Sequence, residues 1–342
     1  MFKFGIIGCG IIAPFHARAI QSVGNSKLVA VCDIIEAKAE AFARQFGVEN
    51  IYTDYRQMLM DADIDIVCIC TPSGLHGEMA IAAARAGKHI LCEKPMEITK
   101  EKLDAVIDEV QKSKVKMACV FQRRMQPLPI KVKRALDSGV FGRILVADAY
   151  LKYHRTKEYY KSADWRATWA LDGGGALMNQ GIHGVDLINW FAGGIESVYG
   201  ITRTQLHAIE VEDSAVCSVK YKSGAIGVIE CTTCVLPAQD SRFEIHCENG
   251  SIIFSDTGLI QWHLAGGENS ATASGEDGFS AKDDPTAIGL LSHLPIVKDL
   301  MDAITYDRAP AVPPEEGRVA ADIILSIYNS SKENREIRIC EK

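Results

Sequence analysis

The sequence predicts an α/β protein with two domains: a doubly wound parallel sheet, then an α+β domain with a large open, mostly antiparallel sheet. Two observations support this prediction. Residues 1–122 alternate continuous apolar runs with stretches of helical spacing, which is typical of buried parallel strands joined by helices. After residue 122 the strands alternate apolar and polar residues, which indicates antiparallel pairing. The length of 342 residues also agrees with about two domains.

The elements of the first domain follow from its apolar periodicity. Strands are predicted where the apolar runs are continuous, at 3–8, 27–33, 64–72, 88–94 and 116–122. Helices are predicted where apolar residues recur every three to four positions, at 11–22, 36–46, 74–86 and 99–113.

The second domain opens with a helix over 127–139, which enters through prolines and ends at Gly139. A long strand (144–154), a polar and aromatic loop (154–172) and a long helix (173–194) follow. The remaining predicted elements are strands at 196–205, 214–221, 225–233, 242–249, 250–256 and 259–264, a loop at 265–285, helices at 287–306 and 315–331, and a strand at 335–339. The predicted domains are 1–122 and 123–342, with the alternative that the C-terminal helix packs back on the first domain.

Composition excludes several classes of partner. The net charge of −7 gives no general basic field for nucleic acid, and no run of 18 apolar residues predicts a membrane span. Eleven dispersed cysteines fit reduced thiols, so we expect a cytoplasmic protein. Cys231 and Cys234 have the spacing of half a zinc site, but they lie in a strand-like segment without a second pair. We therefore expect no bound metal.

The first strand ends in a turn that is typical of dinucleotide binding. Gly8, Gly10 and Ala13 fit the pattern G-x-G-x-x-A, with Ile11 and Ile12 between them. Gly8 allows the tight turn, Gly10 lets a pyrophosphate approach the backbone, and Ala13 keeps the helix close to the sheet. The N-terminus of that helix favours phosphate, because its N–H groups are free and its dipole is positive there.

The second strand ends at Asp33, where an acidic side chain can bind the ribose diol of the cofactor. Ile34 and Ile35 follow, and no arginine stands directly after Asp33. Asp33 would repel a 2′-phosphate, so the sequence favours NAD over NADP. The alternative is a domain of this type whose cofactor site is vestigial.

Two further polar segments follow predicted strands. Thr71 and Pro72, with His76 behind them, follow the third strand, and Glu93 and Lys94 follow the fourth. In open α/β sheets, ligands bind outside the carboxyl ends of the strands, so we expect these residues at the cofactor. The alternative is that both segments are solvent-exposed turns that bind no ligand.

Together these motifs resemble the Gfo/Idh/MocA family of oxidoreductases. The resemblance rests on the glycine turn at 8–13, Thr71-Pro72 with His76, Glu-Lys-Pro at 93–95, and Gly-Gly-Gly-Ala-Leu at 173–177 with His183 and Asp186. It implies an N-terminal Rossmann domain, a C-terminal domain with an open sheet, and NAD(P)-dependent oxidation of a secondary alcohol on a sugar, cyclitol or nucleotide sugar. It also implies a homodimer or homotetramer.

The resemblance also implies site residues. Lys94 and His183 would be catalytic, and Asn179 would lie in the substrate pocket. Relatives that act on inositols carry Asp at this position, so Asn179 is a departure that removes a negative charge from beside His183. In the implied reaction His183 is the general base and Lys94 hydrogen-bonds the reacting oxygen, although the two roles could be reversed.

The segment with Trp165 and Arg166 resembles members that oxidise nucleotide sugars at the 3-hydroxyl, so a UDP-N-acetylhexosamine-type 3-dehydrogenase is one specific alternative. A non-catalytic cofactor-binding regulator and a dehydrogenase of non-sugar substrates are others. Fold analogy alone does not decide among them.

The remaining candidates lie near the predicted domain junction. We expect Gln122 near the nicotinamide, and Arg123 or Arg124 near the substrate. Tyr150 and Lys152 share one face of the first strand of the second domain and are further substrate candidates. Residues 121–166 carry an excess of basic side chains, which favours an anionic, sugar-like substrate in one cleft between the domains.

Overall fold

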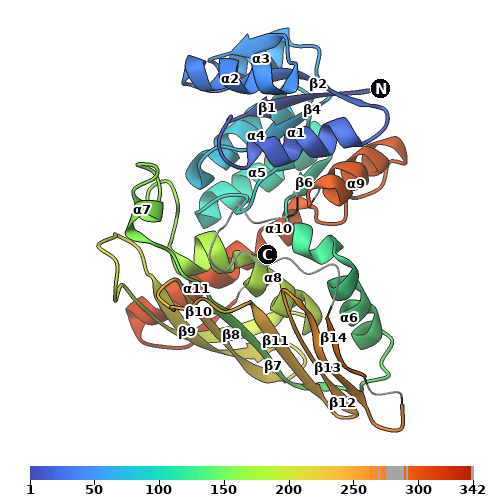
Figure 1. Ribbon diagram of the computed structural model, residues 1–342, viewed down its shortest axis with the longest axis vertical. Helices are drawn as coiled ribbons and strands as arrows, with labels where there is room; N and C mark the ends of the chain where they lie inside the picture. The colour runs from blue at the N-terminus through green and yellow to red at the C-terminus, as the bar shows by residue number, and fades with distance from the viewer. Residues whose placement is uncertain (268–269, 275–288, 290–291, 340–342) are drawn as a thin grey trace. The chain divides into compact units, whose positions relative to one another are not determined.

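The computed structural model describes residues 1–267, 270–274, 289 and 292–339 (Figure 1). The chain divides into two compact units. The first contains residues 1–122 together with 289–318, and the second contains residues 123–288 and 319–342. The expected second domain, 123–342, is therefore interrupted, because the chain returns to the first unit between residues 289 and 318.

The first unit holds a parallel sheet of six described strands in the order β3-β2-β1-β4-β5-β6. Its strands are β1 (Phe2–Ile7), β2 (Ser26–Cys32), β3 (Asn50–Tyr52), β4 (Ile66–Ile69), β5 (His89–Cys92) and β6 (Met117–Cys119). The strand order reverses between β1 and β4, so the carboxyl ends of β1 and β4 flank the point at which such sheets bind ligands.

Helices cover both faces of this sheet (Figure 1). The chain crosses from β1 towards β3 in one direction and from β4 towards β6 in the other. Right-handed crossovers therefore place α1 and α2 on one face and α4 and α5 on the opposite face. The helices are α1 (Ala13–Ser22), α2 (Glu36–Phe46), α3 (Tyr55–Asp61), α4 (His76–Arg85), α5 (Lys100–Ser113), α9 (Leu294–Thr305) and α10 (Pro314–Gly317). Of the returning segment, α9 packs on α1, and α10 packs on α5 and β6.

The second unit is built on a sheet of nine described strands in the order β14-β13-β12-β11-β7-β10-β9-β8-β15. Only β7 and β10 pair in parallel among these strands. The strands are β7 (Ile144–Lys152), β8 (Ile195–Arg203), β9 (Ser214–Tyr221), β10 (Ile226–Thr232), β11 (Arg242–Cys247), β12 (Gly250–Ser255), β13 (Gly258–Leu264), β14 (Ser270–Ser274) and β15 (Ile337–Arg338). The predicted fold class is confirmed for both units.

One face of this sheet carries helices (Figure 1). The helices of the unit are α6 (Pro127–Asp137), α7 (Lys157–Tyr160), α8 (Ile182–Phe191) and α11 (Val319–Glu333). α8 packs on β7, and α11 packs on β8 and α8. A Cβ atom at Gly184 of α8 would overlap the side chain of Leu151, so α8 approaches β7 more closely than a larger residue allows.

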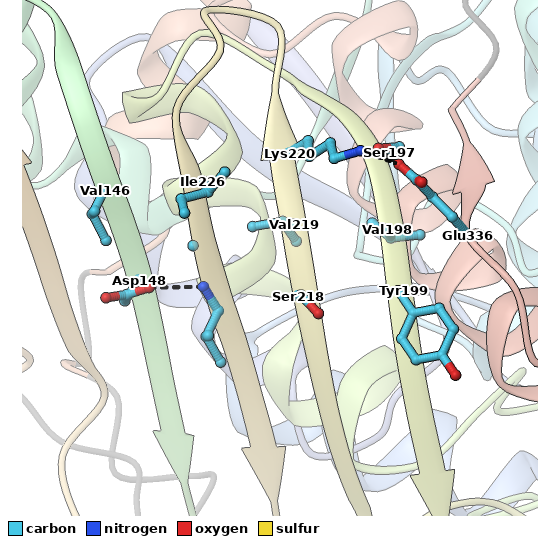
Figure 2. A pocket seen from close by; sticks show the side chains of 12 residues that line it. Val146, Asp148, Ser197, Val198, Tyr199, Ser218, Val219, Lys220, Ile226 and Glu336 are labelled. Carbon is cyan, nitrogen blue, oxygen red and sulfur yellow. Dashed lines mark hydrogen bonds and ion pairs between the residues drawn. The ribbon is translucent and has the colours of Figure 1, made fainter.

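The other face of the sheet has no covering helix among the described residues. On it Tyr199, Ile201, Val216 and Ile226 are exposed, because paired residues of antiparallel neighbours share a face. Figure 2 shows this face, with Asp148, Lys220 and Glu336 lying among apolar side chains. We call it the open face.

Several predicted elements differ from the structure. The short strand β3 and helix α3 were not predicted. The predicted helix over 173–194 begins only at residue 176, and its first turn, Ala176–Gly181, is π-helical. The helix predicted over 287–306 is α9, which begins at residue 294 beside a proline; residues 287–288 and 290–291 lie outside the described residues.

Other differences concern the last third of the chain. The helix predicted over 315–331 is two helices, α10 and α11. In the predicted loop over 265–285, residues 270–274 form β14, while 268–269 and 275–285 are not described. Within the described part of the chain, no helix has both the length and the apolar character that a membrane crossing requires.

Candidate active site

The glycine turn after β1 has the geometry of a phosphate cradle. Gly8 has φ +93°, and a Cβ atom there would lie 2.7 Å from the backbone oxygen of Cys70, so the position requires glycine. A Cβ atom at Gly10 would meet nothing within 4 Å, so the space above this backbone is open. Ile12 is the cap of α1 and makes no side-chain hydrogen bond to it, which leaves the first N–H groups of the helix for a ligand.

Asp33 is fixed beside this turn. Its Oδ2 accepts the backbone N–H of Cys9 at 2.9 Å, and its Oδ1 accepts that of Ile35 at 2.9 Å. Ile11 and Ile34 are 61% and 85% exposed, which is unusual for large apolar side chains and offers an apolar surface next to the carboxylate. These features fit the adenosine half of NAD.

The other cofactor candidates follow neighbouring strands of the same sheet. Thr71 and Pro72 follow β4, Lys94 follows β5, and Gln122 follows β6, so all lie at the carboxyl edge of the sheet. The Oε1 atom of Gln122 is buried and has no hydrogen-bond partner among the described residues. A buried amide oxygen without a partner indicates a missing donor, such as a bound ligand. The first unit therefore fits a nicotinamide dinucleotide.

The ring of His76 contacts two backbone carbonyl groups, and its contact with a cofactor stays a prediction. It is buried, and its Nδ1 and Nε2 lie 2.7 Å from the oxygen of Pro95 and 2.8 Å from the oxygen of Thr71. Both ring nitrogens are thereby occupied by backbone carbonyl groups. His76 thereby links the segment that follows β4 to the segment that follows β5.

Glu93 is held by two histidines. Its Oε1 accepts hydrogen bonds from Nε2 of His16 at 2.8 Å and from Nε2 of His293 at 3.0 Å, and all three side chains are buried. Burial alone would raise the pKa of Glu93, but the two imidazole donors hold it well below its usual range. Burial lowers the pKa of His16, so this ring is a neutral donor. The three residues form a clamp that fixes the backbone just before Lys94, which is half-buried.

In the second unit, Asn179 and His183 lie on consecutive turns, one in the π-helical turn and the other in α8. The carboxylate of Glu212 holds the start of the π-helical turn. It accepts the backbone N–H groups of Gly175 at 2.9 Å and Leu177 at 2.8 Å, and the hydroxyl of Tyr328 at 2.9 Å. Such π-helical turns are frequent at functional sites.

Polar side chains gather around Tyr159, beside Asn179. The Tyr159 oxygen accepts from Nη1 of Arg166 at 2.7 Å and from Nε2 of Gln180 at 2.8 Å, and lies 3.4 Å from Oδ1 of Asn179. The Arg166 guanidinium also stacks on the rings of Tyr159 and Trp165, with its Cζ 4.3 Å and 4.8 Å from their centres. The structure thus brings together Trp165, Arg166 and Asn179 from the predicted substrate residues.

Arg123 lies in a buried ion pair, and its predicted contact with the substrate stays a prediction. Its Nη1 lies 2.8 Å from Oδ1 of Asp256 and 3.2 Å from Oγ of Ser241, and both ionic side chains are buried. Arg124 binds Asp186 through two nitrogens, at 2.8 and 2.6 Å. Removing one partner of a buried ion pair costs about 3–5 kcal/mol, so these arginines stay with their carboxylates.

Tyr150 and Lys152 lie on the open face, opposite α8. The Nζ atom of Lys152 pairs with Glu230 at 3.2 Å there. Leu151, between them, points to α8 instead. The structure therefore does not bring Tyr150 and Lys152 together with Asn179 and His183. The prediction of an anionic substrate rests on Arg123, Arg124, Lys152 and Arg166. Among the described residues, the first three have carboxylate partners and Arg166 has none.

Cys231 and Cys234 contact different neighbours. The Cys231 thiol donates to the backbone oxygen of Ala176 at 3.2 Å, whereas Cys234 lies 3.8 Å from Nδ1 of His207. His207 and Asp213 form a small cluster with Cys234, but Oδ2 of Asp213 already accepts two backbone N–H groups at 2.8 and 3.0 Å. Asp213, His207 and Cys234 thus form a hydrogen-bonded cluster that holds the backbone around residues 206–207.

The sequence reasoning missed five residues that shape these sites: His16, His293, Tyr159, Asp172 and Glu212. Asp172 stands directly before the three glycines, which is a signal that could have drawn attention to it. The partners of His16, His293 and Glu212 are distant in sequence, and no local pattern predicts them.

Two family models match most of the chain. The model for the oxidoreductase family with the NAD-binding Rossmann fold matches residues 2–121, and the model for the GFO/IDH/MocA C-terminal domain matches residues 130–253. The chain belongs to the Gfo/Idh/MocA family. The resemblance seen in the motifs is confirmed, as is the prediction of an oxidoreductase with an NAD-binding domain.

Relatives within the Gfo/Idh/MocA family differ in substrate. Levoglucosan dehydrogenase of Pseudarthrobacter phenanthrenivorans is 30% identical over 73% of either chain. Myo-inositol 2-dehydrogenase of Thermotoga maritima is 26% identical over 99% of either chain. The WlbA dehydrogenase of Bordetella pertussis, solved in complex with NADH and UDP-GlcNAcA, is 30% identical with a TM-score of 0.86, covering 100% of this chain and 99% of that one.

Proposed function

We propose that the protein oxidises a secondary alcohol of a nucleotide sugar of the UDP-N-acetylhexosamine type, with NAD as the hydride acceptor. The observation that carries the choice of substrate is Arg166, which is held by Tyr159 and Trp165 and has no carboxylate partner among the described residues. A guanidinium fixed in this way suits an anionic group. The likeness to the WlbA dehydrogenase, which was solved with a UDP-sugar, supports the same choice.

The proposed chemistry assigns separate tasks to the two units. The nicotinamide, when bound, takes the hydride from the substrate carbon. Gly8, Gly10 and Asp33 hold the dinucleotide, and Gln122 offers its amide oxygen to it. The preference for NAD over NADP rests on the charge of Asp33, which would repel a 2′-phosphate.

The proton of the alcohol passes to His183 in this proposal, and Lys94 donates a hydrogen bond to the reacting oxygen. Two observations support the assignment. The Glu93 clamp fixes the backbone before Lys94, and Glu212 fixes the turn before His183, so both side chains stand on rigid supports.

The first experiment separates the enzyme from a cofactor-binding regulator. Lys94→Ala and His183→Ala should each lower turnover by about 100- to 10,000-fold, the range expected for the loss of a proton-transferring group. Binding of NADH, followed by its fluorescence, should stay within a few-fold. Lys100→Ala and His263→Ala, at exposed positions, are the matched controls. Near-normal turnover in both site variants would reject the proposed roles.

A panel of NAD-linked substrates tests the substrate class. UDP-N-acetylhexosamines and their uronic acids should be oxidised in preference to inositols, levoglucosan and free hexoses. Arg166→Ala should raise KM for UDP-sugars and leave KM for NAD unchanged. Preferred oxidation of an uncharged cyclitol would reject the substrate class, and NADH binding without turnover of any sugar would favour the regulator.

We also propose that the open face packs against a second copy of this chain. Tyr199, Ile201, Val216 and Ile226 are 38–58% exposed on it, although the solvent face of an antiparallel sheet is ordinarily polar. The face also carries both signs of charge, as in Lys220 and Glu336 (Figure 2). Such a surface suits a self-complementary interface.

A further inference from the structure

A buried carboxylate stands directly behind Asn179. Asp172 is 2% exposed, and its Oδ1 accepts a hydrogen bond from Nδ2 of Asn179 at 2.7 Å. An ionised carboxylate only accepts hydrogen bonds, so the amide nitrogen of Asn179 must face Asp172. The amide oxygen is thereby directed to the other side, where the hydroxyl of Tyr159 lies 3.4 Å away.

The same carboxylate fixes a second part of the site. Its Oδ2 accepts the backbone N–H of Ala167 at 2.8 Å, and Ala167 directly follows Arg166. Ala167 has φ +58°, a conformation that alanine rarely adopts, so this contact holds the backbone in a particular turn. Arg166 in turn donates to Tyr159 at 2.7 Å.

These contacts close into a ring. It runs from Asp172 to Asn179, to Tyr159, to Arg166 and, through the backbone of Ala167, back to Asp172. Every side-chain contact in the ring joins a hydrogen-bond donor to an acceptor. The orientation of the Asn179 amide is therefore set by the whole ring.

We propose that Asp172 is a positioning residue that turns the amide oxygen of Asn179 toward the Tyr159 side of the turn, as an uncharged hydrogen-bond acceptor for a substrate hydroxyl. The proposal rests on the function proposed above. The carboxylate lies seven residues before Asn179 and is buried, so the acceptor offered to the substrate at position 179 carries no charge. The choice between a charged and an uncharged acceptor at this position then contributes to substrate preference.

The test exchanges the two residues. Asp172→Asn should lower kcat/KM for the preferred substrate about 10- to 100-fold, because an amide at 172 no longer dictates which end of the Asn179 amide faces it. Asn179→Asp should place two carboxyl groups in one hydrogen bond, so that activity falls and recovers as the pH is lowered and one of them takes a proton.

The double variant, Asp172→Asn with Asn179→Asp, rebuilds a carboxylate–amide bond in the reverse direction. It should regain the thermal stability lost by the single variants, and its preference should shift toward cyclitols relative to UDP-sugars. Asp164→Asn, an exposed acid in the same segment, is the matched control. A double variant that regains stability and keeps the wild-type substrate ranking would reduce Asp172 to a structural contact and overturn the proposal.

A second readout does not depend on turnover. In the ¹⁵N–¹H spectrum, the side-chain amide of Asn179 should move in Asp172→Asn and stay in place in Asp164→Asn. If wild-type protein turns over no sugar while this signal responds, the proposed function fails and the orienting role of Asp172 stands. Altered turnover with an unchanged Asn179 signal would instead reject that role.

Discussion

At the scale of single residues, the hydrogen-bond partners of a polar side chain indicate whether it is placed to bind a ligand or to stabilise the fold. Asp33 illustrates the first kind. Its two oxygens accept backbone N–H groups of the glycine turn and of the residues after β2, which fixes a negative charge beside the proposed ribose. A charge held by the backbone in this way discriminates against a second negative charge nearby.

The substitution Asp33→Asn tests this discrimination. The asparagine keeps one acceptor oxygen and removes the charge, so the ratio of kcat/KM for NAD to that for NADP should fall by about tenfold, equivalent to roughly 1.4 kcal/mol. Steady-state kinetics with both cofactors measure this ratio. Asp61→Asn, exposed at the end of α3, should leave it unchanged. An unchanged ratio in Asp33→Asn would assign cofactor choice to other residues.

The residue positions that a sequence predicts most directly are those at the ends of buried strands. Asp33, Thr71 and Lys94 end strands of the parallel sheet, and a continuous apolar run reveals such an end. Arg123, His76 and Glu93 also lie near strand ends, but their side chains are occupied by Asp256, by two carbonyl groups and by two histidines. Partners this distant in sequence leave no local signal.

At the scale of elements, the π-helical turn before α8 depends on Glu212. This carboxylate is 3% exposed and lies among two backbone N–H groups and the hydroxyl of Tyr328 from α11. Burial raises the pKa of Glu212 to about 7, although the three hydrogen bonds act in the opposite direction. The support of the turn therefore titrates near neutral pH.

This pKa predicts a pH dependence of stability. The folded-state pKa lies above the unfolded value of about 4.3, so the contribution is fully present below the unfolded value and is lost as the pH rises through about 7. The free energy of unfolding of the wild type should fall by up to about 3 kcal/mol relative to Glu212→Gln between pH 5 and pH 8. Urea unfolding of both proteins at each pH measures this difference.

Glu49→Gln, at an exposed position, is the control and should follow the wild type at every pH. Equal pH slopes for the wild type and Glu212→Gln would show that Glu212 does not titrate in this range.

The π-helical turn was not predicted, and a continuous helix was expected over 173–194, because the turn is supported by Glu212 and Tyr328, which are far from it in sequence. The strand β3 was missed for a different reason, since three residues are too few to show a periodicity.

At the scale of the whole molecule, the open face is a surface of the second unit that no described helix covers and that carries exposed apolar side chains. Ile226→Asp places a charge on this face, which should convert a dimer or larger assembly to a smaller species because burying an unpaired charge is costly. Light scattering coupled to size-exclusion chromatography measures the mass. Met60→Lys, at an apolar residue 77% exposed in α3, should keep the wild-type mass. A monomeric wild type would reject the interface.

The two-unit architecture itself was predictable, because a change from continuous to alternating apolar strands marks where one kind of sheet gives way to another. The return of residues 289–318 to the first unit was not predictable from the sequence. A helix has the same amphipathic pattern whether it packs on the first unit or on the second.

That return has a consequence for biosynthesis. When the ribosome has released residue 122, the nascent first unit still lacks α9, which covers α1, and His293, which completes the clamp on Glu93. The backbone N–H of Cys119 in β6 also lacks its acceptor at that point, because it donates to the carbonyl of Val312. The cofactor-binding unit can therefore be completed only after strands β7 to β14 of the other unit have been synthesised, and a transcript cut short after β14 yields a nucleotide-binding half without its final helices.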